Sequence, residues 1–457
     1  IVCMKHVGLN VAADAFINAA ITGINGGLVV LVADDPSMHS SQNEQDSRFY
    51  GKFAMIPILE PHDQQEAYDM AYHAFELSEK YKTPVLMRIP TRLAHSRAGV
   101  NRKTIINENP LRLPADLKQF ILLPAIAKIR YKKLLAAQTS FNEESENSAF
   151  NQYFDGADKS LGIIACGIAY NYYMENAHHF HLNHPVLKIG QYPLPQKLIR
   201  QIVKSCKRIL VLEDGYPFVE DQLNNFLTDD LNISGRLDGS LPRDGELTPD
   251  IVGKALGIEA REIIPVPELV MPRPPSFCKG CSHADTYLQL NEALKDYEKG
   301  RVFSDIGCYT LGALEPYNAI NSCVDMGASI TMAKGAADAG LSPVVAVIGD
   351  STFTHSGMTG LLDIVLEQTP VTVIISDNST TGMTGGQKSS ATGRLESICR
   401  GLGVDPDHIK VITPLHSHFE ENVEIIKKEV SYPAPSVIIS QRECIQTAAR
   451  RKRKMRQ

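Results

Sequence analysis

The sequence predicts an α/β protein built from three doubly wound domains. Short, continuous apolar runs alternate along the chain with helical patterns, which is typical of parallel strands buried on both faces and joined by helices. The length of 457 residues is enough for about three domains of roughly 150 residues each. The composition, 43% apolar and 21% charged, is that of an ordinary globular protein.

The first domain is predicted for residues 1–105, as the C-terminal part of a larger unit. Apolar runs at 27–33 and 84–89 predict strands, and the spacing of apolar residues at 63–81 predicts an amphipathic helix between them. Residues 106–158 are polar, and we expect an irregular connector that crosses the surface.

A middle α/β domain is predicted for residues 159–264. Its strands are expected at 161–166 and 208–213, with a helix at 195–205. The proline-rich segment 265–276 is typical of a stiff linker.

The third domain, predicted at 277–445, has the clearest pattern. Strands are expected at 343–348 and 371–375, and the spacing of apolar residues at 357–367 predicts the helix that connects them. A basic tail follows at 446–457; we expect a solvated end, and the alternative is binding to RNA or to an acidic partner.

Polar residues follow the two strands of this unit. Gly349 and Asp350 come after the first strand, and Asn378 comes after the second. Neighbouring parallel strands end at the same edge of a sheet, where such sheets bind ligands, so Asp350 and Asn378 are expected side by side. Mg²⁺ takes carboxylate, amide or carbonyl, and phosphate oxygens, so the stretch predicts a metal-bound diphosphate. The alternative is an ordinary βαβ unit whose Asp and Asn cap turns.

The overall charge and the apolar runs exclude several classes of protein. A net charge of −6, from 46 basic and 52 acidic residues, argues against a nucleic-acid binder. The apolar runs are too short for a membrane span, and no signal peptide is visible. Nine cysteines without disulfide-like spacing suit a reducing cytosol, so we expect a cytoplasmic protein.

The cysteines of the third domain admit two interpretations. A C-x-x-C pair and two later cysteines could hold zinc or an iron–sulfur cluster, or could form the wall of a cofactor pocket. These four residues are Cys278, Cys281, Cys308 and Cys323. The second interpretation is favoured because the later pair lies on two separate loops, and both place the four thiols in one pocket. Three other cysteines are expected to be buried structural thiols: Cys166, Cys206 and Cys399.

Seven segments, in collinear order, resemble one family. They are residues 4–14, 32–46, 277–283, 304–312, 323–330, 349–353 and 383–385. Together they are similar to the large (alpha) subunit of indolepyruvate ferredoxin oxidoreductase, one of the thiamine diphosphate-dependent 2-oxoacid:ferredoxin oxidoreductases. The similarity covers essentially the whole chain.

The resemblance implies a transketolase-like, thiamine diphosphate-binding fold. The aminopyrimidine would bind to the domain at 1–105 and the diphosphate to the domain at 277–445, with Mg²⁺ held by Asp350, Asn378 and the carbonyl group of Thr380. The implied cofactor contacts are Cys281, His283, Ile306, Gly307, Cys308, Met326, Gly327, Gly349, Asp350, Ser351, Thr352, Thr381, Gly382, Met383 and Thr384. Ser351 departs from the third glycine that is usual in the motif.

The resemblance also implies a reaction. The thiazolium carbon attacks the keto carbon of an arylpyruvate, CO₂ leaves, electrons pass singly through iron–sulfur clusters to ferredoxin, and coenzyme A takes the acyl group. The implied partners are a smaller beta subunit and ferredoxin. His6 and His39 are candidate substrate contacts.

Two features depart from the family pattern. The glutamate that activates the aminopyrimidine has no match by motif, so the catalytic residue stays unassigned, and the first residue, Ile1, indicates a chain truncated at its start. The two cysteine runs of a C-terminal ferredoxin-like domain are also absent, which places the [4Fe–4S] clusters on a missing domain or a partner. Two alternatives to the oxidoreductase therefore stay open: a non-oxidative 2-oxoacid decarboxylase, and a catalytically dead scaffold that binds the cofactor.

Overall fold

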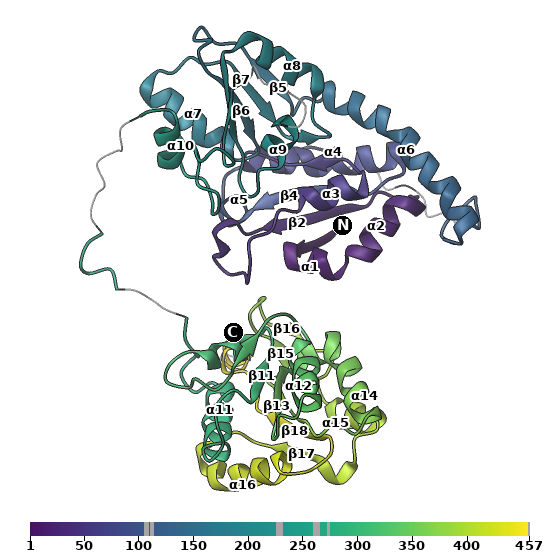
Figure 1. The fold of residues 1–457 in the computed structure, drawn as a ribbon, viewed down its shortest axis with the longest axis vertical. Coiled ribbons are helices and arrows are strands. Elements are labelled where there is room, and N and C mark those ends of the chain that lie inside the picture. Colours follow the sequence, from purple (N-terminus) through teal and green to yellow (C-terminus); the bar gives the residue numbers. More distant parts are fainter. Residues whose placement is uncertain (105–108, 110–113, 225–231, 259–265, 272–274, 456–457) are drawn as a thin grey trace. The chain divides into compact units, whose positions relative to one another are not determined.

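The computed structural model describes residues 1–104, 109, 114–224, 232–258, 266–271 and 275–455 (Figure 1). The chain forms two compact units, residues 1–265 and residues 266–457. The described part contains three sheets of five or six strands and one two-stranded sheet, and the predicted α/β class is confirmed. The predicted linker lies partly outside the described residues, and the predicted domain boundaries remain predictions. No helix within the described ranges combines the length and apolar character that a membrane crossing needs.

The first sheet of unit 1 contains the strands predicted at 27–33 and 84–89. In sheet order the strands are β1 (Val2–Lys5), β2 (Val29–Asp34), β4 (Val85–Pro90), β3 (Ile58–Leu59) and β8 (Gln191–Tyr192). The first four are mutually parallel, whereas β8 pairs antiparallel with β3. A strand from the middle of the chain therefore completes the sheet that begins at the N-terminus.

The helices of this region include the predicted one. They are α1 (His6–Val11), α2 (Ala13–Thr22), α3 (Arg48–Ala54), α4 (Gln64–Tyr81) and α5 (Thr91–His95). The carboxylate of Asp63 caps α4 by accepting a hydrogen bond of 2.7 Å from the amide of Glu66. Met70, Ala74 and Leu77 lie at helical spacing on the buried face, which confirms the predicted amphipathic pattern.

The second sheet contains the strands predicted at 161–166 and 208–213. In order its strands are β10 (Asn232–Ser234), β9 (Arg208–Leu212), β6 (Gly162–Cys166), β7 (Val186–Ile189) and β5 (Gln152–Phe154). Only β5 runs antiparallel to its neighbour. Its helices are α7 (Ala169–Phe180), α8 (Gln196–Ser205), α9 (Phe218–Asn224) and α10 (Pro249–Ala255), of which α8 confirms the predicted helix at 195–205.

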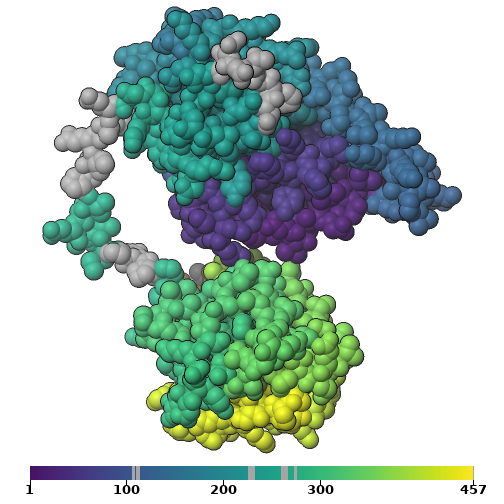
Figure 2. All heavy atoms as spheres, viewed as in Figure 1, coloured from purple at the N-terminus to yellow at the C-terminus, as the bar shows by residue number. Residues whose placement is uncertain are grey.

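The expected irregular connector instead contains a long helix, α6 (Pro124–Glu146). Proline in the first turn and a run rich in alanine, leucine, lysine and glutamate favour a helix. Only Leu134, Phe141 and Ser145 are buried. Figure 2 shows α6, in blue, on the surface of the first unit. The polar composition of this segment reflects a helix that is mostly exposed. The expectation of an irregular segment was wrong.

A buried guanidinium joins the two sheets of unit 1. Arg88 on β4 donates from Nε to Asp34 Oδ2 (2.6 Å) and from Nη2 to the carbonyl oxygen of Asp214 (2.7 Å), which follows β9. Arg88 also pairs with Glu60, and all four residues are almost completely buried. Burial raises the pKa of Asp34, and the neighbouring Arg88 opposes that rise.

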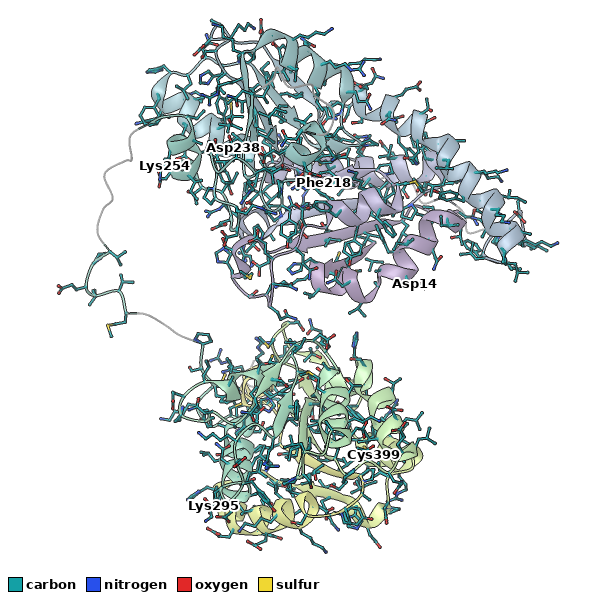
Figure 3. All side chains as sticks on the ribbon, in the orientation of Figure 1. Asp14, Phe218, Asp238, Lys254, Lys295 and Cys399 are labelled. Atoms are coloured by element: carbon teal, nitrogen blue, oxygen red, sulfur yellow. The ribbon has the colours of Figure 1, made fainter. Side chains whose placement is uncertain are left out.

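A second buried guanidinium extends this network. Arg48 on α3 pairs with Asp46, reaches Glu213 Oε2 at 2.9 Å and donates to the carbonyl oxygen of Tyr216 at 2.9 Å. Its guanidinium also lies 5.1 Å from the ring centre of Phe218, a residue labelled in Figure 3. Charged groups from both sheets therefore neutralise one another in the interior of unit 1.

Unit 2 is built on a six-stranded, fully parallel sheet. In order its strands are β12 (Ser322–Cys323), β11 (Val302–Ser304), β13 (Val345–Gly349), β14 (Thr372–Asp377), β18 (Ser436–Gln441) and β17 (Ile409–Ile412). The strands predicted at 343–348 and 371–375 are confirmed as β13 and β14, which are hydrogen-bonded neighbours with Gly349 opposite Ser376.

Helices cover both faces of this sheet, as a doubly wound fold requires. They are α11 (Ser282–Ala293), α12 (Ala328–Asp338), α14 (Met358–Leu366), α15 (Leu395–Gly401) and α16 (Phe419–Val430). A further helix, α17 (Ile445–Met455), follows β18 and has no buried residue. Ala346 and Ile348 of β13 pack in one apolar cluster with α12 and α14, whereas Val345 and Val347 pack in another with α11 and α16. Helix α14 confirms the helix predicted at 357–367.

We expect the substitution Arg88→Met to lower the free energy of unfolding by about 3–5 kcal/mol, because it leaves the buried carboxylates of Asp34 and Glu60 without their cation. Urea-induced unfolding followed by circular dichroism measures the change. The matched control is Arg97→Met at an exposed position, where a change within about 0.5 kcal/mol is expected. Equal effects of the two substitutions would contradict a stabilising role of the buried network.

Candidate functional site

The carboxyl ends of four neighbouring strands bring polar residues to one edge of the sheet in unit 2. Asp305 follows β11, Asp350 follows β13, Asn378 follows β14, and Cys444 lies just beyond β18. The β13–β14 pairing brings the chain positions of Asp350 and Asn378 together, as the sequence predicted. This edge is where open α/β sheets bind ligands.

Asp350 is a buried carboxylate with unused hydrogen-bonding capacity. It is only 3% exposed, and its Oδ2 atom has no hydrogen-bond partner. Burial raises its pKa to about 6, and the neighbouring Asp377 also raises it. A buried oxygen without a partner is costly unless a ligand satisfies it. The environment of Asp350 therefore fits a bound cation.

The other two predicted metal ligands are also buried at this edge. Asn378 Oδ1 accepts a hydrogen bond of 3.1 Å from the amide of Thr380, and Asn378 Nδ2 lies 3.2 Å from His283 Nε2. The three predicted ligands include only one carboxylate. Within the described ranges, no group of three or more His, Cys, Asp or Glu side chains is arranged to hold a metal ion.

His283, in the first turn of α11, is a neutral imidazole at physiological pH. Its complete burial lowers its pKa to about 4, and the nearby Arg442 lowers it further. Because the ring is neutral, Nε2 can accept the hydrogen bond that Asn378 Nδ2 donates. His283 therefore fixes the side chain of Asn378.

Tyr309 forms the floor beneath the glycines of the site. A Cβ on Gly349 would lie 2.5 Å from its ring, and one on Gly307 would lie 2.3 Å from it. The hydroxyl group of Tyr309 donates to Asp305, whose pKa burial raises to about 6. The close approach of Tyr309 therefore requires glycine at both positions, a reason that the sequence did not reveal.

The remaining predicted contacts from the β11 side also lie near Asp305 and Tyr309. The Tyr309 hydroxyl lies 3.0 Å from the carbonyl oxygen of Ile306 and 3.2 Å from Thr352 Oγ1. Gly327, at φ 99°, donates its amide to Asp305 Oδ2 at 3.2 Å. Met326, 39% exposed, accepts a hydrogen bond from Ser356 through its carbonyl oxygen.

The loop after Asn378 forms a short hairpin, β15 (Thr380–Thr381) with β16 (Gln387–Lys388). Thr381 Oγ1 lies 2.9 Å from Ser351 Oγ, so the predicted hydroxyl groups of two separate segments meet. Thr384 and Gly382 are exposed, and the Met383 side chain is 66% exposed. The hairpin therefore presents hydroxyl and backbone amide groups beside Asp350.

His6 and His39 belong to unit 1. His6 begins α1, is 1% exposed, and neither ring nitrogen has a hydrogen-bond partner. Burial lowers the pKa of His6, and the nearby carboxylate of Asp34 partly opposes that lowering. His39 is largely exposed, with Nε2 3.4 Å from Glu246. Their substrate contacts remain predictions.

A cavity of about 240 Å³ beside His283 and Asn378 is lined by four thiols. The four are Cys278, Cys281, Cys308 and Cys444. Burial, together with the other three thiols, raises the pKa of Cys308 to about 11. Cys323 does not line this cavity; its sulfur lies 3.7 Å from the carbonyl oxygen of Asp305. The expectation that Cys323 shares the pocket was wrong, because β12 lies at the sheet edge away from β18, and Cys444 takes that place.

Arg442 holds the loop of the C-x-x-C pair. Its guanidinium lies 2.7 Å from Asp285 Oδ2 and donates to the carbonyl oxygen of Gly280 at 3.0 Å. Gly280 lies between Cys278 and Cys281, and Cys281 caps the start of α11. The segment that follows β18 therefore supplies both a thiol, Cys444, and Arg442, which anchors the opposite wall of the cavity.

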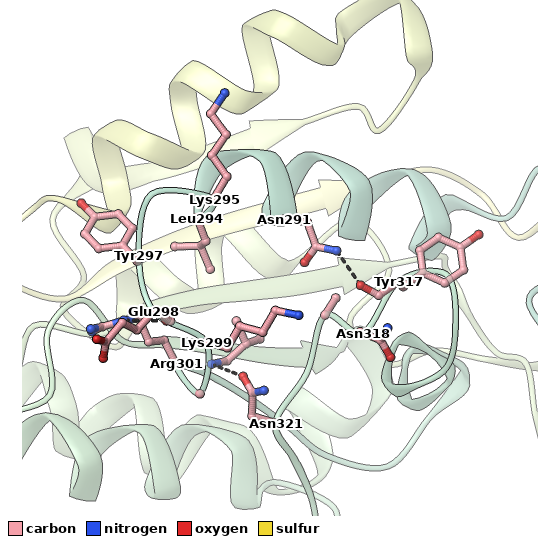
Figure 4. Close-up of a pocket in the computed structure, with 13 residues that line it drawn as sticks. Asn291, Leu294, Lys295, Tyr297, Glu298, Lys299, Arg301, Tyr317, Asn318 and Asn321 are labelled. Carbon is pink, nitrogen blue, oxygen red and sulfur yellow. Dashed lines mark hydrogen bonds between the residues drawn. The ribbon is translucent and has the colours of Figure 1, made fainter.

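Another cavity, of about 250 Å³, lies at the amino end of β11 (Figure 4). Its lining includes Asn291, Lys295, Lys299, Arg301, Tyr317 and Asn321. The side-chain amide of Asn291 donates to the carbonyl oxygen of Tyr317 at 2.7 Å. One polar group of the cavity wall is therefore already hydrogen-bonded within the protein. No residue predicted from the sequence lines this cavity.

Known proteins resemble the chain over nearly its whole length. Residues 305–439 match the model of the thiamine pyrophosphate enzyme C-terminal TPP-binding domain. The indolepyruvate oxidoreductase subunit IorA of Methanothermobacter thermautotrophicus is 37% identical, over 97% of this chain and 75% of that protein. IorA of Archaeoglobus fulgidus is 36% identical, over 96% of this chain and 74% of that protein. A solved 2-oxoglutarate:ferredoxin oxidoreductase from Magnetococcus marinus, 15% identical, aligns with a TM-score of 0.42 over 56% of this chain and 52% of that chain.

We expect Asp350→Asn to weaken binding of thiamine diphosphate with Mg²⁺ at least about a hundredfold while stabilising the ligand-free chain at pH 7.5 by about 2 kcal/mol. The pKa of about 6 means that the folded state holds a proton between about pH 4 and 6 that the unfolded state releases. The ionised carboxylate therefore opposes folding above this window. The penalty declines as the pH falls below 6 and is gone below about pH 4.

Calorimetric titration of the cofactor and urea unfolding at pH 5 and 7.5 measure both effects. The matched control, Asp363→Asn, changes an exposed carboxylate on α14 and should alter neither. Normal cofactor binding by the Asp350→Asn variant would show that Asp350 is not part of the binding site.

Proposed function

Since the chain belongs to the family of the indolepyruvate oxidoreductase subunit IorA, we propose that it is the thiamine diphosphate-binding alpha subunit of a 2-oxoacid:ferredoxin oxidoreductase. The observation that carries this proposal is the unpartnered oxygen of Asp350 beside Asn378, at the carboxyl edge of a parallel sheet. Cation binding would satisfy that oxygen and remove the cost of burying it.

The residues of this edge would share the work of holding the cofactor. Asp350, Asn378 and the carbonyl group of Thr380 would hold Mg²⁺ on the diphosphate. Ser351 and Thr381 would direct their adjacent hydroxyl groups at phosphate oxygens. The backbone amides of the loop after Thr381 would add further donors.

The residues beneath the site would keep it rigid. Thr352 and Ile306 contact the hydroxyl group of Tyr309, which in turn fixes Asp305 and the strand ends that carry Gly307 and Gly349. Neutral His283 would orient Asn378 without adding charge near the cation. Bound thiamine diphosphate supplies the carbon nucleophile that decarboxylates a 2-oxo acid.

The IorA names of the relatives support an arylpyruvate as the substrate and a second subunit as partner. Coenzyme A as acyl acceptor, ferredoxin as electron acceptor and a smaller beta subunit are proposed from the sequence resemblance. His6 and His39 stay assigned to the substrate, and Met326 and the rest of the predicted contacts to the cofactor, as proposals. For Cys281 and Cys308, ligation of a cluster, proposed below, is the alternative to a cofactor contact. The nine free cysteines suit a reducing compartment, so we place the protein in the cytoplasm.

We expect the chain, assembled with its beta subunit, to release CO₂ and reduce ferredoxin when supplied with indole-3-pyruvate, coenzyme A, thiamine diphosphate and Mg²⁺. The specificity constant kcat/KM for indole-3-pyruvate should exceed that for 2-oxoglutarate at least about tenfold. Product analysis separates the alternatives: aldehyde without reduced ferredoxin indicates a non-oxidative decarboxylase. Cofactor binding without CO₂ release indicates a scaffold.

The four-thiol cavity supports a second part of the proposal. Four cysteines are the usual ligands of a [4Fe–4S] cluster, and a cluster spreads its ligands more widely than a single metal ion does. We propose that Cys278, Cys281, Cys308 and Cys444 hold such a cluster in this chain. A cluster there would accept electrons one at a time. The sequence led us to expect the [4Fe–4S] clusters outside this chain. A cluster in the four-thiol cavity would instead lie within the chain, beside the cofactor site.

We expect Cys444→Ala to lower the iron and acid-labile sulfide content of anaerobically purified protein and to remove the visible absorbance of the cluster. The matched control is Cys323→Ala, which changes a half-buried thiol outside the cavity and should leave the iron content unchanged. Stoichiometric zinc in the unaltered protein, without sulfide, would instead identify a zinc site.

A further inference from the structure

We propose that helix α17 is the docking surface for a small acidic protein that carries single electrons. The proposal rests on the proposed function, and it names the face of unit 2 where the electron acceptor binds. The alternative for this helix is a solvated end with no partner. The argument depends on its charge, on its position beside the four-thiol cavity and on how little of its charge is neutralised.

Helix α17 concentrates positive charge on a chain that is acidic overall. Five consecutive basic residues, from Arg450 to Lys454, occupy its second half, and the helix contains no acidic residue. The whole chain has a net charge of −6. All five side chains are exposed. The helix is therefore a local positive patch that attracts acidic surfaces and repels basic ones.

Little of this charge is neutralised within the chain. Arg451 pairs with Glu443 at 2.9 Å, and Arg450 donates to the carbonyl oxygen of Gly385 at 2.9 Å, which leaves its charge in place. Within the part of the chain that the structure describes, Lys452, Arg453 and Lys454 form no ion pair. Three cations are thus free to contact a partner.

The same helix begins in the wall of the four-thiol cavity. Ile445, Thr447 and Arg450 line that cavity, and Gln446 Nε2 lies 3.5 Å from Cys278 Sγ. At a rise of 1.5 Å per residue, Lys454 lies roughly 12 Å along the helix axis from Gln446. A protein held by the cations would therefore lie next to the four thiols that would hold the proposed cluster, the group that would supply its electrons.

The position of the charge favours an electron carrier over a nucleic acid. A nucleic acid needs a basic surface long enough to follow its backbone, and the rest of this chain is acidic. A small acidic carrier needs only a compact positive patch close to the redox site. Complementary charge would raise its association rate, and dissolved salt would screen the attraction.

The test compares two triple charge reversals in the enzyme assembled with its beta subunit. One is Lys452→Glu, Arg453→Glu and Lys454→Glu on α17. The matched control is Lys299→Glu, Arg400→Glu and Lys428→Glu, which makes the same change in net charge at exposed positions elsewhere on unit 2. The assay follows reduction of an acidic ferredoxin, with reduction of the cationic dye benzyl viologen measured in parallel.

We expect the α17 reversal to lower kcat/KM for ferredoxin at least about tenfold at low ionic strength, chiefly through KM, and to abolish its dependence on salt. Reduction of benzyl viologen should stay within about twofold, because the chemistry at the cofactor is intact. The control triple should change ferredoxin reduction by less than about twofold.

Equal loss in the two triples would overturn the proposal, because the effect would then follow net charge alone. An unchanged kcat/KM for ferredoxin in the α17 reversal would overturn it as well, and so would binding of single-stranded RNA, but not ferredoxin, that depends on α17. Failure of the proposed function is distinguishable from all of these, because the unaltered enzyme supplied with a 2-oxo acid would then reduce neither ferredoxin nor benzyl viologen.

Discussion

The parallel pairing of β11, β13, β14 and β18 is the constraint on which the rest of unit 2 depends. Parallel strands all end in the same direction, so the chain leaves each of them at one edge of the sheet. Asp305, Asp350, Asn378 and Cys444 are separated by up to 139 positions (from 305 to 444), yet each follows one of these strands. The backbone ladder, rather than contacts among the polar side chains, brings them together.

The buried carboxylates of the two units have different surroundings. In unit 1, Asp34 and Glu60 contact the buried guanidinium of Arg88, so their charges are compensated within the chain. In unit 2, Asp350 forms no ion pair with any described residue, and the nearby carboxylate of Asp377 adds to the rise in its pKa. Asp34 also has one oxygen without a hydrogen-bond partner, so the absence of a pairing cation is what distinguishes Asp350. Groups left unsatisfied in an otherwise consistent fold are expected at functional sites, where a ligand completes them. This contrast separates a structural cluster from a binding site.

Local patterns in the sequence were sufficient for the elements around Asp350. The apolar runs of β13 and β14 and the helical spacing of α14 are properties of short segments, and adjacency of the two strands followed from the short connection between them. Cys444 could not be found in this way. No pattern within either segment indicates that β18 pairs with β14. Cys323 lies closer in sequence to the other thiols, and it was therefore assigned to the pocket in place of Cys444.

Exposure explains the other differences. Helix α6 buries few residues, so its sequence lacks the apolar period by which helices are recognised. Tyr309 explains the glycines at 307 and 349, but its approach to Gly349 crosses between strands and has no signature in either segment. Sequence therefore predicts what each segment forms, and tertiary packing decides which segments meet.

The placement of β8 has a consequence for synthesis of the chain. Strand β3 is an edge of its sheet until Gln191 and Tyr192 pair with it, and the hydroxyl group of Tyr192 donates to Glu60 at 2.7 Å. A ribosome must therefore add more than 130 residues after Ile58–Leu59 before this edge is covered. At about 5–20 residues per second, the nascent sheet exposes an open edge for roughly 7–26 seconds. During that interval the open edge of β3 can pair with a strand of another chain.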